Sequence, residues 1–195
     1  MFTGITTHRG RIKKITKSKI PEYYIETDLK MKKISVGSSI MCSGICLTVT
    51  KILKNVFVVN ISEETLKVTN ACYWKKDTFI NLEKSLALGD EMGGHIVTGH
   101  VDCISKVKKV QQLQKSVKYD FSIATKLEKF LCKKGSVTID GISLTVNKVK
   151  KKEFSVDLIP HTLKLTTLGK LQKGDKVNLE IDILARYIDK NINSK

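Results

Sequence analysis

The chain has 195 residues, of which 41% are hydrophobic and 28% are charged. That composition is ordinary for a soluble globular protein, and the length fits one large domain or two domains of about 100 residues each. No stretch approaches the roughly 20 apolar residues that a membrane span needs. The start of the sequence lacks a charged segment followed by an apolar one. We therefore expect no membrane association, no secretory signal and a cytoplasmic location.

A formal net charge of +16 invites a nucleic-acid interpretation. Nearly all of this charge is lysine, because the only arginines are Arg9, Arg11 and Arg186. Arginine is the residue suited to bidentate recognition of phosphates and bases. Aromatic residues, at 6%, are not interleaved with the lysine clusters as they are in proteins that bind single strands. We expect a solvated, lysine-rich surface and no nucleic-acid partner.

The cysteines are odd in number and form no Cys-x-x-Cys pair. This spacing argues against a disulfide framework and against a structural zinc site. His95 and His100 are close in sequence but lack a convincing third metal ligand. We therefore expect no bound metal and five reduced thiols. The thiols are those of Cys42, Cys46, Cys72, Cys103 and Cys132.

In chain order, short runs of alternating apolar and polar residues are separated by turn signals. At 45–49, Ile, Leu and Val alternate with Cys46 and Thr48, and a period of two with β-branched residues predicts a half-buried strand. The patterns instead favour short helices at 62–68, 124–133 and 184–192. The first of these begins with a serine N-cap candidate followed by acidic residues. Further strands are predicted at 57–61, 142–146, 154–159 and 177–183.

The second half of the sequence repeats the first at a shift of about 95 to 97 residues. Several short strands in each half favour a closed barrel, which removes exposed strand edges. The Gly93-Gly94 pair suits a turn between two domains. We predict one barrel at 1–94, a second at 95–186, and a short C-terminal helix or tail at 187–195. The matching segments are Thr3-Gly4 and Thr98-Gly99, 44–49 and 141–146, 65–69 and 162–166, and 81–83 and 178–180.

Seven short motifs occur in order between residues 1 and 169, within a resemblance that covers roughly residues 1 to 188. They are Met1-Phe2-Thr3-Gly4-Ile5, Gly44-x-Cys46-Leu47-Thr48-Val49, Glu64-Thr65-Leu66, Gly93-Gly94-His95-x-x-x-Gly99-His100-Val101, Asp140-Gly141-Ile142-Ser143-Leu144-Thr145-Val146, Leu158-Ile159-Pro160-x-Thr162-Leu163 and Thr166-Thr167-Leu168-Gly169. Each motif is weak by itself. Together, at this spacing, they resemble the riboflavin synthase family of the alpha type.

The resemblance implies an all-β fold of two tandem six-stranded antiparallel Greek-key β-barrels with a short C-terminal helix, assembled as a homotrimer. It implies a transferase that dismutates two molecules of 6,7-dimethyl-8-ribityllumazine. One donates a four-carbon unit and becomes 5-amino-6-(D-ribitylamino)uracil, and the other becomes riboflavin. No cofactor is expected. The active site is expected between the N-terminal barrel of one subunit and the C-terminal barrel of its neighbour, and lumazine synthase is a further partner to consider.

The resemblance also indicates the site residues. Positions with a catalytic part are Phe2, Ser39, Cys46, His100 and Asp182. Positions that contact substrate in the first half are Gly4, Ile5, Thr6, Cys46, Leu47, Thr48, Asn60, Ile61, Ser62, Glu63, Glu64 and Thr65. Those in the second half are Gly99, His100, Val101, Lys134, Ser143, Leu144, Thr145, Leu158, Ile159, Pro160, His161, Thr162 and Leu163.

The two halves agree in their frame residues but differ at polar and reactive positions, as two like substrates with different fates would require. Cys46, for example, aligns with Ser143. We expect His100 to take or relay a proton from the acidic C7 methyl group of one lumazine. Water, the Cys46 thiol or the Ser39 hydroxyl is expected to add to C7 of the other. Asp182 is expected to hold ribityl hydroxyls or to assist proton transfer.

Structural interpretations stand beside these roles. Cys46 in a strand is more often a packing residue, Phe2 could fill a barrel mouth, and Asp182 could be a helix N-cap. The competing function is a non-catalytic lumazine- or flavin-binding protein of the same fold, which would show a loss of polar residues in one pocket. Both halves keep theirs, which favours the enzyme.

Overall fold

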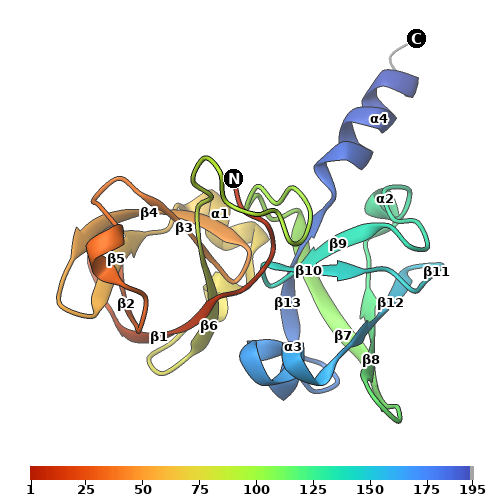
Figure 1. Cartoon of the computed structure of the whole chain (residues 1–195), viewed down its shortest axis with the longest axis horizontal. Coiled ribbons are helices and arrows are strands. Elements are labelled where there is room, and N and C mark those ends of the chain that lie inside the picture. The colour runs from red at the N-terminus through yellow and green to blue at the C-terminus, as the bar shows by residue number, and fades with distance from the viewer. Residues whose placement is uncertain (194–195) are drawn as a thin grey trace.

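Residues that alternate between the inside and the outside of a sheet form the strands of this protein. The computed structural model describes residues 1–193, apart from the side chain of Lys33. Two strand-rich halves lie side by side, and one helix projects from them (Figure 1). In Glu22–Thr27, Tyr23, Ile25 and Thr27 are buried while the residues between them are partly exposed. Each half encloses an apolar core of its own.

The first half closes into a six-stranded barrel in the order β1-β2-β5-β4-β3-β6, with every neighbouring pair antiparallel. This order is a Greek key, and closure leaves no free strand edge. The strands are β1 (His8–Ile15), β2 (Glu22–Thr27), β3 (Ser39–Cys42), β4 (Ile45–Ile52), β5 (Val56–Asn60) and β6 (Phe79–Lys84). The helical turns are η1 (Met31–Lys33), α1 (Glu63–Val68) and η2 (Asn70–Tyr73).

The second half repeats this arrangement with one strand divided, so that its sheet has seven strands rather than the predicted six, in the order β10-β9-β13-β7-β8-β12-β11. The counterpart of β4 is split into β10 and β11, which only Val146 and Asn147 separate in the chain. The two pieces of this one strand lie at opposite ends of the sheet. Since they are nearly continuous in the chain, the sheet curves until its ends approach each other, which makes it barrel-like. The strands are β7 (Cys103–Gln112), β8 (Val117–Ser122), β9 (Ser136–Ile139), β10 (Ile142–Thr145), β11 (Lys148–Lys150), β12 (Glu153–Leu158) and β13 (Lys176–Ile181).

The helices agree in part with the sequence patterns. Ser62 is the N-cap of α1, as predicted, because its hydroxyl accepts a hydrogen bond from the Thr65 N–H at 3.1 Å. The predicted helix at 124–133 is a single turn. The patterns did not predict α3, which begins at Pro160, where the fixed φ of proline suits a first helical position. The helices of the second half are α2 (Thr125–Glu128), α3 (Pro160–Leu165), η3 (Thr167–Lys170) and α4 (Ile183–Asn193).

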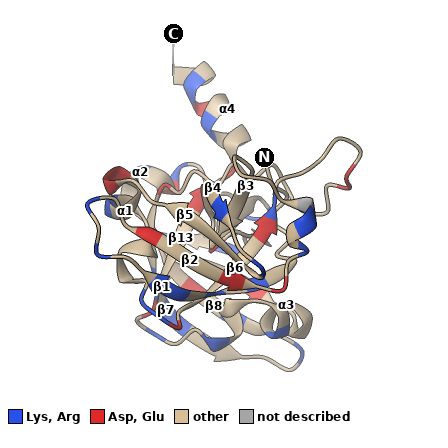
Figure 2. Ribbon diagram, turned by 90° about the vertical axis from the view of Figure 1, so that its left-hand side faces the viewer, with Lys and Arg blue, Asp and Glu red and all other residues tan. Residues whose placement is uncertain are grey.

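The predicted short C-terminal helix is confirmed as α4, which begins at Ile183 and so starts before the predicted boundary at 187. Residues 194–195 of the predicted tail lie outside the described residues. None of the helices within 1–193 is long and apolar enough to cross a membrane. Lysine and arginine lie on strands, loops and helices of both halves, interspersed with acidic residues (Figure 2).

The two halves meet across an approximate twofold axis that relates aligned residues. The hairpin turns Ser43-Gly44 and Asp140-Gly141 face each other there, and all four residues have positive φ, as type I′ turns require. A Cβ atom on Gly44 would lie 2.9 Å from the Gly141 nitrogen, and one on Gly141 would lie 2.8 Å from the Gly44 nitrogen. Glycine at both positions therefore allows the turns to pack this closely.

Two aligned asparagines tie each half to the other. Asn81 Nδ2 donates a hydrogen bond to the Asp140 carbonyl at 3.0 Å, and Asn178 Nδ2 donates one to the Ser43 carbonyl at 2.7 Å. The oxygen of each amide accepts a backbone N–H of the opposite half. Since a buried amide must find its partners, these bonds fix the orientation of the halves.

The symmetry is broken at Asp140, which aligns with Ser43. Each side chain accepts the backbone N–H of the nearby asparagine, from Asn178 at 2.7 Å and from Asn81 at 3.1 Å. Burial raises the pKa of Asp140 to about 7, against the opposing effect of its hydrogen bonds with Asn178 and Asn70. This carboxyl is therefore protonated in the folded protein over a pH range in which the unfolded chain ionises it.

Replacement of Asp140 by asparagine should change how stability depends on pH. An acid with a raised pKa in the folded state stabilises that state fully below its unfolded pKa of about 3.9, and this contribution is lost as the pH rises through about 7. Asparagine keeps the acceptor and tolerates positive φ, but it does not titrate. Compared with the unmodified protein, we expect Asp140→Asn to have a similar unfolding temperature near pH 4 and an unfolding temperature several degrees higher at pH 8. Thermal unfolding followed by circular dichroism measures the unfolding midpoint at each pH. If the midpoints of the two proteins changed with pH in parallel, the prediction would be contradicted.

Candidate functional site

The predicted substrate contacts gather on two equivalent surfaces, one on each half. The first seat comprises 46–48 of β4, 60–65 from the end of β5 into α1, and the segment 99–101. The second seat comprises 143–145 of β10, 158–163 from the end of β12 into α3, and the segment 4–6. Each seat thus takes its strand from one half and its loop segment from the other, because the two loop segments are exchanged between the halves.

Two matched backbone hydrogen bonds hold the exchanged segments. The Ser143 N–H donates to the Gly4 carbonyl at 2.8 Å, and the Cys46 N–H donates to the Gly99 carbonyl at 2.9 Å. Both glycines have a φ of +78°, and a Cβ atom on either would lie 2.6 Å from the Cβ atom of the residue it faces. Any other residue at either position would force the segment away from the strand.

Two buried carboxylates, which the sequence analysis missed, position these segments. Glu83 accepts from the Thr3 N–H at 2.7 Å, the Thr3 hydroxyl at 2.8 Å and the Gly4 N–H at 3.0 Å. Glu180 accepts the corresponding three bonds from Thr98 and Gly99 at 2.6 to 3.0 Å. Burial raises the pKa of both glutamates, and the hydrogen bonds oppose that rise. The Asn-Leu-Glu sequence repeated at 81–83 and 178–180 is the signal that could have revealed them, because glutamate is rarely buried without a partner.

The first seat brings together three of the predicted catalytic residues. Cys46 is partly buried and Thr48 is exposed on the same side of β4, and Ser39 on β3 is the cross-strand partner of Thr48. Val101 packs against the core of the first half, although it belongs to the second repeat. The exposed His100 precedes it in the same segment. Cys46, Ser39 and His100 therefore lie around one surface.

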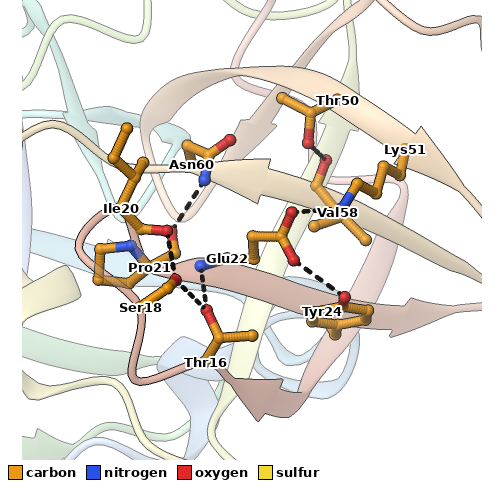
Figure 3. Close-up of polar contacts among 10 residues, drawn as sticks. All are labelled: Thr16, Ser18, Ile20, Pro21, Glu22, Tyr24, Thr50, Lys51, Val58 and Asn60. Carbon is orange, nitrogen blue, oxygen red and sulfur yellow. Dashed lines mark hydrogen bonds and ion pairs between the residues drawn. The ribbon is translucent and has the colours of Figure 1, made fainter.

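Asn60 fixes the end of β5 beside this surface. Its Nδ2 donates to the Pro21 carbonyl at 3.0 Å, on the turn that leads into β2 (Figure 3). In the same region Glu22 accepts from Lys51 Nζ at 2.5 Å and from the Tyr24 hydroxyl at 3.0 Å, and these bonds lower the pKa of Glu22. The polar cluster joins β2, β4 and β5, so the strand that leads to Ser62 is held on both sides.

The second seat has a hydroxyl where the first has a thiol. Ser143 Oγ lies 2.6 Å from His95 Nδ1, a contact that the sequence analysis did not foresee. The Lys134 N–H donates to the Val146 carbonyl at 2.7 Å, and Lys134 has a φ of 71°. This bond holds the turn before β9 against the end of β10. Besides His100, the exposed members of the predicted second-half set are Lys134, Thr145, Ile159, Pro160 and His161.

Two of the predicted catalytic residues have evident structural roles. Phe2 is 0% exposed, and its backbone forms a two-way bridge with Val97 between the halves. Asp182 Oδ1 accepts from the Leu184 N–H at 2.9 Å at the start of α4, as a helix cap does. Asp182 is also close enough to His95 to oppose the lowering of the His95 pKa by burial. It therefore lies near the second seat, whereas Phe2 fills the interface.

Thr6 in the second seat has an unused polar atom. The residue is 9% exposed, and its Oγ1 has no hydrogen-bond partner within residues 1–193. A buried hydroxyl without a partner costs free energy. A ligand that offered a polar group here would remove that cost.

One cleft of about 460 Å³ lies between the halves beside Tyr73 and Lys176, outside both seats. Another, of about 490 Å³, adjoins Ile5 of the second seat and the loop 85–93. The seats themselves are open surfaces, since residues such as Thr48 and Thr145 are exposed. In the described part of the chain, no three His, Cys, Asp or Glu side chains come together as metal ligands.

Comparison with known proteins agrees with this duplicated arrangement. The lumazine binding domain family matches residues 3–85 and again residues 98–182. Riboflavin synthase of Brucella abortus (strain 2308) is 44% identical over 195 residues, which are 96% of this chain and 96% of that protein. Riboflavin synthase of Photobacterium phosphoreum is 41% identical over 193 residues, covering 97% of this chain and 88% of the relative. That of Bacillus subtilis (strain 168) is 36% identical over 189 residues, covering 96% and 88%.

Solved structures share the fold at lower identity. LumP in complex with 6,7-dimethyl-8-(1'-D-ribityl) lumazine has a TM-score of 0.83 at 23% identity, and LumP in complex with riboflavin has a TM-score of 0.84 at 24% identity. Each comparison covers 93% of this chain and 99% of the LumP chain. With two lumazine binding domains and full-length relatives of this kind, the chain belongs to the riboflavin synthase family of transferases.

Proposed function

We propose that this chain converts two molecules of 6,7-dimethyl-8-ribityllumazine into riboflavin and 5-amino-6-(D-ribitylamino)uracil. The observation that carries this proposal is the pair of equivalent seats, held by matched glycine contacts but unlike at Cys46 and Ser143. A four-carbon unit moves from one ring to the other, and the two products contain all the atoms of the two substrates. No external oxidant or reductant is therefore needed, and we expect no cofactor.

The seats offer the groups that such a ligand requires. A lumazine ring has amide-like donors and acceptors along one edge, and its ribityl chain carries hydroxyls. Thr48 and Thr145 are exposed hydroxyls at equivalent positions of the two seats. Thr6 adds a buried hydroxyl without a partner among the described residues. Positioning of two stacked rings supplies most of the rate enhancement, since the substrate is reactive by itself.

Three of the proposed reactive side chains lie at the first seat, and Asp182 lies near the second. His100, exposed at the first seat, takes or relays the proton from the C7 methyl group of one lumazine. The nucleophile that adds to C7 of the other is water, the Cys46 thiol or the Ser39 hydroxyl, and both residues belong to the first seat. Asp182 caps α4 and holds ribityl hydroxyls with its remaining acceptor capacity. Of the remaining predicted contacts, Ile61 and Leu158 are buried in the two cores, whereas Ile159, Pro160 and His161 are exposed.

The open seats and α4 support a homotrimer. Leu184, Ile188 and Ile192 recur every fourth residue along α4 and are 57%, 59% and 69% exposed. Such a row of apolar side chains on a projecting helix requires a partner surface (Figure 1). Packing of three copies around α4 would bring the first seat of one subunit against the second seat of its neighbour, so that two rings could stack between them.

The five free cysteines fit the cytoplasmic location that we propose. Association with a lumazine synthase is consistent with a substrate that such an enzyme supplies. The alternative is a binding protein without turnover, and the fold shared with the LumP complexes supports it. The polar groups present at both seats favour the enzyme.

Riboflavin formation tests the proposal directly. The purified chain, incubated with 6,7-dimethyl-8-ribityllumazine alone, should produce one riboflavin for every two lumazines consumed, measured by flavin absorbance. Cys46→Ala and His100→Ala should each lower turnover by about tenfold or more, because each removes a reactive group from the first seat. Cys132→Ala, which replaces an exposed thiol outside the seats, is the matched control. Ligand binding without riboflavin formation would instead establish the non-catalytic alternative.

The trimer is tested by a charge placed in the apolar row of α4. Ile188→Lys should convert the assembly to monomers in analytical ultracentrifugation and should abolish turnover, because neither seat can then face its counterpart. Asn193→Lys adds the same charge to the same helix outside that row and should leave the assembly intact. Full activity of a monomeric Ile188→Lys protein would show that the seats act within one chain.

A further inference from the structure

A histidine bridges two hydroxyls in the second seat. His95 Nδ1 lies 2.6 Å from Ser143 Oγ, and His95 Nε2 lies 3.1 Å from Thr138 Oγ1. Ser143 and Thr138 are directly opposed on β10 and β9, so one imidazole spans a cross-strand pair. Thr138 is only 1% exposed. The ring therefore connects a buried hydroxyl to the one that faces the seat.

The backbone before the histidine is shaped to place this ring. A Cβ atom on Gly94 would collide with the Thr3 carbonyl oxygen and would lie 2.9 Å from Ser143 Cβ. The His95 N–H donates to the same Thr3 carbonyl at 3.1 Å. Glycine thus lets the chain pass directly over Thr3 and Ser143, and the next residue is fixed where its side chain must meet β10.

The first seat has a different pair at the same place. There the cross-strand partners are Met41 and Cys46, and they pack in a small apolar cluster with Phe2 and Val97. The frame of hydrogen bonds around the pair is the same in both halves. The seats therefore differ mainly in this cross-strand pair. In the second seat an imidazole bridges two hydroxyls, and in the first seat a phenyl ring packs against an apolar pair.

The protonation state of the ring sets the direction of these hydrogen bonds. Burial lowers the pKa of His95, with Asp182 in opposition, so the imidazole is neutral at physiological pH. A neutral imidazole has one donor and one acceptor. In the tautomer that donates from Nε2 to Thr138, Nδ1 accepts the Ser143 hydroxyl proton. The lone pairs of the Ser143 oxygen then remain free to accept a hydrogen bond from a ligand.

We propose that His95 is a positioning residue that orients the Ser143 hydroxyl as a hydrogen-bond acceptor for the lumazine held in the second seat. This role rests on the proposed function and deepens it. His95 acts through Ser143, makes the second seat chemically unlike the first, and selects there a ligand group that carries an N–H or O–H donor. Thr138 holds the far side of the ring and so fixes its orientation.

The test compares His95→Ala, His95→Asn, Ser143→Ala and the double variant His95→Ala/Ser143→Ala. We measure kcat and KM for 6,7-dimethyl-8-ribityllumazine, its binding by fluorescence, and the thermal unfolding midpoint. His8→Ala is the matched control, because His8 Nδ1 forms a similar 2.9 Å contact with Thr7 Oγ1 at the surface. Asparagine at position 95 keeps a polar group near the place of Nδ1 and is expected to fold even where alanine does not.

A positioning role predicts that His95→Ala lowers kcat about tenfold, that His95→Asn recovers most of this loss, and that the double variant loses no more than Ser143→Ala alone. His8→Ala should retain full turnover. Losses that multiply in the double variant would overturn the inference, as would a His95→Ala protein within about twofold of the unmodified chain.

The binding measurement separates this inference from the proposed function. If the unmodified chain forms no riboflavin, the proposed function fails. The inference still stands if His95→Ala and Ser143→Ala weaken the same one of two binding events by similar factors. It falls if only one of the two variants does so.

Discussion

The crossed backbone hydrogen bonds between the halves are the interaction on which the rest of this structure depends. Each joins a glycine carbonyl of one repeat to a strand N–H of the other, at Gly4 with Ser143 and at Gly99 with Cys46. Because glycine allows a contact closer than any side chain would permit, the loop segment of one repeat becomes a wall of the opposite seat. The seats are therefore products of the interface, and neither half can form one by itself.

Two buried glutamates make this interface specific. A buried carboxylate is costly unless hydrogen bonds surround it, and Glu83 and Glu180 each accept three from a Thr-Gly pair. A displaced segment would leave a carboxylate without its donors inside the protein. That cost keeps Thr3-Gly4 and Thr98-Gly99 in register with the strands, and it explains why a glutamate is buried in both β6 and β13.

The sequence predicted the duplicated strands, but it could not show that the loop segments are exchanged between the halves. Alternation at 45–49 and 142–146 indicated the strands, and alignment of the halves paired Cys46 with Ser143. The same alignment results whether a loop segment folds onto its own half or onto the other, so the exchange was invisible. The division of β10 from β11 has a local cause: Asn147 stands where the first half has Thr50, whose hydroxyl bonds to Val58 at 3.1 Å, and asparagine disfavours strands.

The difference between the two seats also affects the stability of the fold. The exchange of Met41 for Thr138 in the corresponding strand places a hydroxyl in a position that is 1% exposed, where an unpaired group would cost free energy. His95 satisfies that hydroxyl and, with its other nitrogen, reaches Ser143. A residue that only filled space there would leave Thr138 unpaired. The chemistry of the second seat and the packing behind it are therefore coupled, because the same imidazole pairs with the buried hydroxyl and with the one at the seat.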